Sequence, residues 1–236
     1  MQAEASPAPN SRVISSARVE VPHDWSWNDG IGFLPLEGRA VPYDEPYFEK
    51  YVRMGDTTQG QKITDTRIDF LVTWVEKDHT SILDIGIGSG HFLTGLTTRW
   101  WPYVAHKHWS VYGTDVNPVG IEWLKTHKLL APEDLKANVL TFWDVLEHIP
   151  DPSPIFNHHQ PEWIFAAMPI YHNEEHVFRS KHYKPGEHCW YFTEAGFRRW
   201  MASFGYICVG VNAREIVQGG REDIWSFVFR RREDLV

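Results

Sequence analysis

The sequence predicts an α/β fold with one mostly parallel sheet and helices on both of its faces. Its 236 residues suffice for one domain with a full core and are too few for two ordinary domains. From residue 81 onward, short apolar runs of strand type alternate with segments of helical spacing. Two β-rich runs close the chain around Gly219-Gly220, which predicts a C-terminal antiparallel hairpin.

The expected elements follow from apolar spacing and turn signals. The first long helix is indicated by Ile63, Arg67, Phe70 and Leu71, which lie on adjoining turns of one helical surface. The last helix has a start signal at Thr193. Helices are expected over 45–52, 63–75, 91–99, 119–128 and 193–204. Strands are expected over 81–85, 110–114, 139–143, 163–168, 206–212 and 224–230.

The chain divides into an amino-terminal extension, residues 1–42, and a main domain, residues 43–236. Residues 1 to about 20 are rich in Ala, Ser and Pro and predict a flexible tail. The following segment shows neither helical nor strand periodicity but contains Trp25, Trp27 and Phe33. We therefore expect an irregular arm that docks on the main domain by its aromatic side chains.

Composition and charge exclude several classes of protein. The net charge of −8 argues against a nucleic-acid partner and against a polybasic membrane binder. Two cysteines exclude a disulfide framework and a zinc site of four thiolates. No apolar run approaches the length of a membrane span, and the first residues lack the apolar region of a secretion signal. These features predict a soluble, cytoplasmic protein; they do not indicate its oligomeric state.

The strongest functional signal is a glycine-rich turn after the first strand of the predicted sheet. Asp84 stands near the strand end, and Gly86, Gly88 and Gly90 follow at every second position before a helix. Glycine lets the backbone pass close to a ligand because no Cβ stands in the way. The run lacks the dinucleotide pattern GxGxxG and the Gly-Lys-Ser/Thr of a P-loop. An acid beside the turn suits a cationic amino group better than a phosphate.

Two further acids stand at the carboxyl ends of predicted strands. Asp115 ends the second strand, about 25 residues beyond Gly90, where an acid can accept hydrogen bonds from a ribose diol. Asp144 ends the third strand. A single acid in such a position is often only a helix N-cap. Three in order favour a ligand site, because ligands of open parallel sheets bind at this edge.

Together these motifs resemble the class I S-adenosylmethionine-dependent methyltransferases. Residues 84–90 are similar to that family's first motif, and Asp115 to its ribose-binding acid. Residues 144–152, with 181–183, 185–188 and 191–193, resemble the ubiquinone-biosynthesis-type small-molecule O-methyltransferases. The resemblance covers roughly residues 43–231 and implies a Rossmann-like methyltransferase fold with S-adenosylmethionine as the cofactor.

The resemblance also implies where the cofactor binds. Arg67, 17 residues before the acid of the first motif, looks like the arginine that reaches the cofactor's carboxylate in those relatives. Trp143 either stacks on the adenine or packs in the core. Only 24 residues separate Asp115 from the third strand, so the strand that usually contacts adenine is expected to be shortened or absent. The cofactor-binding residues expected are Arg67, Asp84, Gly86, Gly88, Gly90, Asp115, Asn117 and Trp143.

The catalytic residues are expected just beyond the third strand, where Asp144, Glu147 and His148 are spaced i, i+3, i+4. A helical turn there would place all three on one face. In one interpretation His148 is the general base for an acceptor hydroxyl. In another, the three residues and a downstream histidine, His188 or His182, ligate Mg²⁺, Mn²⁺ or Zn²⁺, as a similar cluster does in small-RNA 2′-O-methyltransferases. In a third, they only shape the substrate wall.

The His-rich stretch 170–190 is expected to cover the acceptor as a lid, because long loops in compact domains are usually functional or disordered. The leading prediction is a methyltransferase acting on an oxygen of a small molecule. The alternatives are a metal-assisted RNA ribose 2′-O-methyltransferase and a cofactor-binding accessory protein without turnover.

Overall fold

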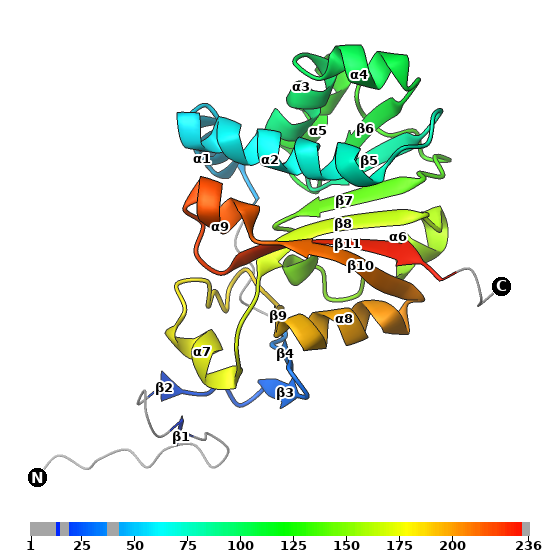
Figure 1. Cartoon of the computed structure of the whole chain (residues 1–236). Coiled ribbons are helices and arrows are strands. Elements are labelled where there is room, and N and C mark those ends of the chain that lie inside the picture. Colours follow the sequence, from blue (N-terminus) through cyan, green and yellow to red (C-terminus); the bar gives the residue numbers. More distant parts are fainter. Residues whose placement is uncertain (1–12, 15–18, 37–42, 233–236) are drawn as a thin grey trace, which may run out of the picture.

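The computed structural model describes residues 13–14, 19–36 and 43–232, so most of the predicted flexible tail lies outside the described residues. Its centre is a six-stranded sheet with the order β10-β11-β8-β7-β5-β6 (Figure 1). Strands β5, β6, β7 and β8 run parallel, and β11 pairs antiparallel with both β8 and β10. The bounds are β5 Ser81–Ile85, β6 Ser110–Thr114, β7 Val139–Trp143, β8 Trp163–Pro169, β10 Tyr206–Asn212 and β11 Ile224–Arg231. The predicted α/β fold and its antiparallel C-terminal pair are confirmed.

Helices cover both faces of the sheet, because alternate strand residues point to opposite sides. In β7, Val139 and Trp143 join the apolar cluster under α2, α3, α4 and α5, whereas Leu140 and Phe142 join the cluster under α6 and α8. The bounds of these helices are α2 Thr58–Trp74, α3 His91–Thr97, α4 Trp101–His106, α5 Pro118–Thr126, α6 Ser153–His159 and α8 Glu194–Ser203. A further helix, α1 (Glu45–Gly55), packs on α2 and α5.

The sheet ends early at β6, as the short spacing after Asp115 predicts. In place of a further strand, Leu130 makes a single parallel bridge to Gly113. The amide of Gly113 donates to the Leu129 carbonyl over 2.8 Å, and the Ala131 amide donates to the Gly113 carbonyl over 3.0 Å. The edge of the sheet beside β6 is therefore closed by a loop.

Segments outside the sheet differ most from the expected pattern. The arm predicted to be irregular contains β3 (Ser26–Asn28) and β4 (Ile31–Phe33), which form a small sheet with β9 (Trp190–Phe192). The remaining short elements are β1 Val13–Ile14, β2 Val19–Glu20, the 3-10 turn η1 Leu146–His148, α7 Glu174–Arg179 and α9 Arg214–Gly219. In the lower part of Figure 1, the small sheet and α7 lie beside one another, away from the helices above the main sheet. Among the described helices, none combines the length and the apolar content needed to cross a membrane.

Candidate cofactor and acceptor site

The glycine-rich turn after β5 has the backbone of a ligand cradle. Gly86, Gly88 and Gly90 all have positive φ, at 71°, 54° and 75°. A Cβ at Gly86 would approach the Val145 side chain to 2.8 Å, so this glycine is required by packing. A Cβ at Gly88 would meet nothing within 4 Å. Open space therefore faces the middle of the turn, where the backbone can approach a bound molecule.

Asp115 lies beside this turn, at the end of β6. Its carboxylate accepts a hydrogen bond from the Asn117 amide over 2.8 Å. Burial raises the pKa of Asp115, and hydrogen bonds from the backbone of Asn117, Gly88, Val116 and Ile87 oppose the shift. The structure thus brings the acid expected to bind ribose to the glycine-rich turn. In the described structure, backbone amides of the turn and of the following loop interact with this carboxylate.

Asp84 is almost fully buried, with 1% of its surface exposed. Its Oδ1 accepts a hydrogen bond from the Thr141 hydroxyl over 2.6 Å. Burial raises the pKa of Asp84 to about 8, against the opposing effect of the Thr141 hydrogen bond. A cation bound nearby would favour the charged carboxylate and restore a lower pKa.

Asn117, in the loop after β6, stabilises the local structure through two side-chain hydrogen bonds. Its side-chain oxygen caps α5 by accepting from the Val119 amide over 2.9 Å. Its amide nitrogen donates to the Asp44 carbonyl over 3.0 Å, which fastens the start of α1 to the loop after β6. The buried side chain therefore joins two elements that border the cradle, while cofactor contact by Asn117 stays a prediction.

Arg67 belongs to a cluster of four alternating charges. Its Nε donates to Glu215 over 2.8 Å, and its Nη2 donates to Asp144 over 2.7 Å. Arg221 donates to the same two carboxylates at 2.6–2.9 Å. Nη1 of Arg67 takes part in none of the hydrogen bonds that the described residues form within this cluster.

The cluster changes the interpretation of Asp144. This residue has a φ of 61°, in the left-handed region that Asp tolerates better than most residues, and it turns the chain between β7 and η1. Although burial acts in the opposite direction, Arg221 and Arg67 hold the pKa of Asp144 well below its usual range. Its carboxylate faces two guanidinium groups, and it does not share the helical face with Glu147 and His148 that the spacing suggested.

Trp143 lies in the core layer next to Phe92 and below Arg67, whose guanidinium carbon is 5.2 Å from the indole ring centroid. Of the two roles considered for this residue, the structure supports packing. Within the described part of the chain, the buried indole N–H has no hydrogen-bond partner. Buried donors are usually paired, so this N–H group, which lies near Arg67, could donate a hydrogen bond to a bound ligand.

Three metal-capable side chains converge beyond β7. Glu147 and His148, in η1, and His188, before β9, have ligand atoms that all lie within 4.8 Å of one another. Glu147 is 2% exposed and His188 is 3% exposed. In the described residues, Oε2 of Glu147 and Nδ1 of His188 have no hydrogen-bond partner. Orphaned buried atoms of this kind fit a proton, a divalent ion or an acceptor oxygen.

Burial disfavours the charged forms of the two imidazoles. Burial lowers the pKa of His148, and burial together with the neighbouring His148 and Lys184 lowers the pKa of His188 well below its usual value. Burial and the charge of Asp144 raise the pKa of Glu147 well above its usual range. In the absence of a bound cation, all three shifts disfavour the charged forms of these side chains.

The tautomer of His148 follows from its neighbour. Nδ1 lies 2.9 Å from the carbonyl oxygen of Glu187, which can only accept a hydrogen bond. Nδ1 therefore carries the proton in the neutral ring, and Nε2 carries the lone pair. The Tyr43 hydroxyl lies 3.5 Å from the same Nδ1, so the segment that leads into α1 borders the cluster as well.

The His-rich stretch supplies one of its four histidines to this cluster. Nε2 of His182 pairs with the Glu222 carbonyl at 2.9 Å, and His176 lies 3.4 Å from Asp223. His172 is exposed. Of the two downstream histidines considered as ligands, the structure places His188 in the cluster.

Sequence reasoning missed three residues of this region. Glu215 and Arg221 follow β10 and meet Asp144 and Arg67 across separations of 77 to 148 residues, for which the sequence holds no local signal. Tyr43 precedes a helix start marked by the N-cap Asp44, and nothing in the sequence indicates that it reaches His148.

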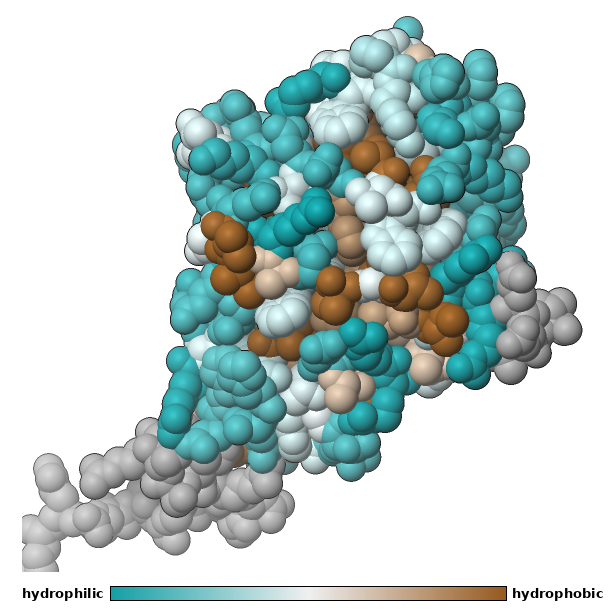
Figure 2. Space-filling model, in the orientation of Figure 1, coloured by the Kyte–Doolittle hydropathy of each residue, from teal (hydrophilic) through white to brown (hydrophobic). Residues whose placement is uncertain are grey.

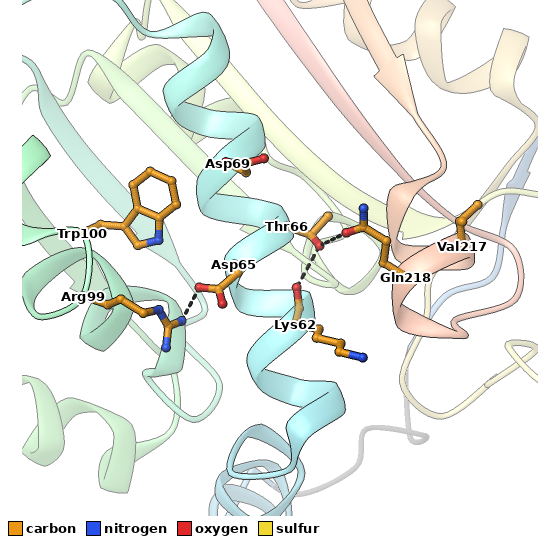
Figure 3. Close-up of a pocket in the computed structure, with 8 residues that line it drawn as sticks. All are labelled: Lys62, Asp65, Thr66, Asp69, Arg99, Trp100, Val217 and Gln218. Carbon is orange, nitrogen blue, oxygen red and sulfur yellow. Dashed lines mark hydrogen bonds and ion pairs between the residues drawn. The ribbon is translucent and has the colours of Figure 1, made fainter.

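A separate groove of about 880 Å³ lies outside this region (Figure 3). Its walls come from the outer side of α2, the segment between α3 and α4, and α9; they are lined by Lys62, Asp65, Thr66, Asp69, Arg99, Trp100, Val217 and Gln218. Figure 2 shows apolar side chains over α9 and β10 on the same face, where Ile207 and Val217 are exposed. No residue of the glycine-rich turn lines this groove, which is therefore separate from the cradle.

Comparison with known proteins agrees with the geometry. A family model described as a methyltransferase domain matches residues 57–210. None of the curated proteins matches the sequence. Similar solved structures are a chain from the complex of the Haloferax volcanii Trm112 methyltransferase activator with a methyltransferase, and magnesium protoporphyrin IX methyltransferase from Synechocystis PCC 6803 with bound S-adenosylhomocysteine.

The first has a TM-score of 0.54 and 13% identity, over 79% of this chain and 98% of that one. The second has a TM-score of 0.53 and 15% identity, over 80% and 96%. The small RNA methyltransferase HEN1, with a TM-score of 0.51 and 18% identity, is matched over 72% of this chain and 25% of its own length. At these identities the structures establish the fold. The family match covers more than half of the chain, which therefore belongs to the methyltransferase domain family and has the class I fold.

Proposed function

We propose that this protein transfers the methyl group of S-adenosylmethionine to an oxygen of a small-molecule acceptor, at the cluster of Glu147, His148 and His188. The observation that carries the proposal is the convergence of two imidazoles and one carboxyl next to the end of β7. The finer resemblance to ubiquinone-biosynthesis-type enzymes agrees with an oxygen acceptor and remains part of the proposal.

The residues of the cradle fit the cofactor. The open space at Gly88 would admit the nucleoside, and Asp115 would accept hydrogen bonds from the ribose hydroxyls. Nη1 of Arg67 and the unpaired N–H of Trp143 would meet the carboxylate. Asp84 would face the cationic amino group. In this assignment Trp143 acts by its N–H group and not by stacking on adenine.

The lone pair of His148 Nε2 gives the acceptor oxygen a base. As that oxygen attacks the methyl carbon, the new C–O bond forms while the S–C bond breaks, and S-adenosylhomocysteine leaves. The hydroxyl proton moves to His148, whose Nδ1–H stays on the Glu187 carbonyl. Burial keeps the imidazole neutral before the reaction, and the elements around the site hold the two reactants together.

The same three side chains fit a divalent ion. Two histidines and one carboxylate are a common donor set for catalytic metals, and the orphaned Glu147 Oε2 and His188 Nδ1 would gain a partner. The Glu187 carbonyl would orient His148 through its other nitrogen. When bound, such an ion lowers the pKa of an acceptor hydroxyl. Asp144, committed to Arg67 and Arg221, is not needed in this set.

The test uses purified protein and S-adenosylmethionine labelled in the methyl group. The protein and the labelled donor are incubated with a low-molecular-mass metabolite extract or with total RNA, each with and without a chelator. Label transfer to the metabolite extract, lost in His148→Ala and kept in His106→Ala, is the expected result. His106 is an exposed histidine at the end of α4 and controls for the substitution itself.

The metal-capable cluster also favours a second candidate, an RNA ribose 2′-hydroxyl as the acceptor. The net charge of −8 opposes it, because RNA binding is dominated by phosphate contacts. Label transfer to RNA that a chelator abolishes would establish this candidate. Tight binding of S-adenosylhomocysteine without transfer to either pool would instead indicate an accessory protein.

A further inference from the structure

The arm (residues 21–34) and the lid (residues 170–192) share an apolar cluster of their own. Its buried members all come from these two segments: Val21, Trp25, Leu34, Tyr171, Val177, Phe178 and Tyr191. The two clusters that flank the main sheet contain none of them. The arm therefore completes the core of the lid, and each segment buries the other's apolar side chains.

Strand β9 of the lid lies between the arm and the acceptor cluster. The amide of Cys189 donates to the Glu147 carbonyl over 2.8 Å, and the Cys189 carbonyl accepts from the Leu34 amide over 2.9 Å. From there β4 pairs with β9 in antiparallel register, Phe33 opposite Trp190. The residue next to His188 is thus fixed from one side by the cluster and from the other by the arm.

A side-chain path leads from the arm to His188 itself. The Tyr191 hydroxyl donates to the carbonyl of His188 over 3.2 Å. The Tyr191 ring packs edge-on against Trp25, with centroids 5.2 Å apart. Trp25 also contacts Phe178 at 5.1 Å and donates its N–H to Glu174 in α7 over 2.8 Å. Trp25 therefore touches both the helix and the strand of the lid.

We infer that the arm is a positioning element of the acceptor site, and that Trp25 is the residue that holds the lid, and through it His188, against Glu147 and His148. The inference rests on the proposed role of His188 in that cluster. It assigns a purpose to the segment before the main domain: the arm serves the acceptor half of the site and leaves the cofactor cradle untouched. Trp25 acts through Tyr191 and contacts no reacting atom.

Cys189 provides a direct probe, because it is fully buried next to His188, whereas Cys208 in β10 is partly exposed. The full-length chain and its Trp25→Ala variant are alkylated with iodoacetamide, and the modified peptides are quantified over time. Alkylation of Cys189 is expected to accelerate at least about tenfold in Trp25→Ala, while Cys208 changes less than about twofold. Trp101→Ala, at an exposed tryptophan that begins α4, is the matched control and should leave both rates unchanged.

Affinity for S-adenosylhomocysteine should stay within about twofold in Trp25→Ala, while methyl transfer to the acceptor pool falls at least about tenfold. Trp25→Phe keeps a ring against Tyr191 and Phe178, and it should restore most of the transfer and the slow alkylation. An unchanged Cys189 rate in Trp25→Ala would overturn the inference. Equal acceleration at Cys208 with loss of cofactor affinity would also overturn it, since the arm would then stabilise the whole fold.

Failure of the proposed function has a different signature. If His188→Ala transfers methyl groups as fast as the unmodified chain, the cluster is not the acceptor site, whatever the alkylation rates are. If His188→Ala is inactive and Trp25→Ala is fully active with a protected Cys189, only the arm's role is wrong.

Discussion

The two halves of the site are built in opposite ways. The cofactor half is made of backbone and of acids that close neighbouring parallel strands, so one stretch of sequence, residues 84–90, forms most of the cradle. The proposed acceptor half joins η1 to His188, about 40 residues later in the chain, and we infer that it depends on an arm about 150 residues before His188. A local motif can specify the first half, whereas only the completed fold specifies the second. The two halves should therefore fail separately when they are mutated.

His148→Ala tests that separation with the largest expected effect. Loss of a positioned base should lower kcat by about 10²–10⁴-fold, whereas the dissociation constant for S-adenosylhomocysteine should change less than about twofold. Methyl-transfer rates and calorimetric titration measure the two quantities. Parallel loss of cofactor affinity would show that the halves are not independent.

The same base predicts the acid limb of the pH profile. Because burial lowers the pKa of His148, the imidazole stays neutral below its usual titration range. The transfer rate should therefore hold as pH falls to about 6.5 and decline only below it. A decline that begins above pH 7 would be contrary to a base whose pKa is lowered in this way.

Gly88→Ala and Gly86→Ala form a matched pair in the cofactor half. At Gly88 the new methyl enters open space at a φ of 54°, so stability should fall only by about 1–2 kcal/mol while cofactor affinity falls at least about tenfold. At Gly86 the methyl meets Val145 at 2.8 Å, so the main loss should be in thermal stability. Thermal denaturation with and without S-adenosylhomocysteine distinguishes them. Equal cofactor binding by Gly88→Ala and the parent chain would place the ligand elsewhere.

Asp84→Asn should separate stability from binding within the cofactor half. The folded state raises the pKa of Asp84 to about 8, so it holds a proton that the unfolded chain releases near pH 4. The contribution of Asp84 to the free energy of unfolding is fully present below pH 4 and is lost as the pH rises toward 8. The asparagine variant should therefore gain about 2–5 kcal/mol at pH 9 and nothing at pH 4, while binding S-adenosylhomocysteine poorly. Chemical denaturation at the two pH values measures the gain.

His182→Ala should have the smallest effect. His182 and His188 lie in one lid, but the His182 ring pairs with the Glu222 carbonyl and lies outside the cluster. We expect a change in kcat/KM of less than about threefold. A loss comparable to that of His188→Ala would mean that the lid closes differently around a bound acceptor.

The central sheet was largely predictable, because its strands carry their own signals. The bounds of β5, β6, β7 and β10 agree with those expected from apolar runs and turn residues. The helices α4, α7 and α9 have six residues each, too few for a helical period to stand out. Strand β9 has three residues and pairs with an arm about 160 positions earlier, which no local pattern could indicate.

The candidate site was predictable to a similar extent. Asp84, the glycines and Asp115 follow one another along parallel strands, and the fold brings them to one edge as expected. The spacing of Asp144, Glu147 and His148 suggested a shared face, but the left-handed turn at Asp144 and its two arginine partners separate it from the others. Those partners come from α2 and from the segment after α9, so the charge balance around Asp144 becomes visible only in three dimensions.

The ion pairs among Arg67, Asp144, Glu215 and Arg221 have a consequence for recognition of the methyl donor. Each guanidinium group pairs with both carboxylates, so the cluster carries no net formal charge. In the proposed assignment Arg67 of this cluster would meet the carboxylate of the donor and Asp84 its ammonium group. Both side chains are largely buried, so ionic strength, which screens exposed charges over about 10 Å, should affect this recognition little. Donor analogues without either the ammonium or the carboxylate should then be rejected alike, at low and at high salt.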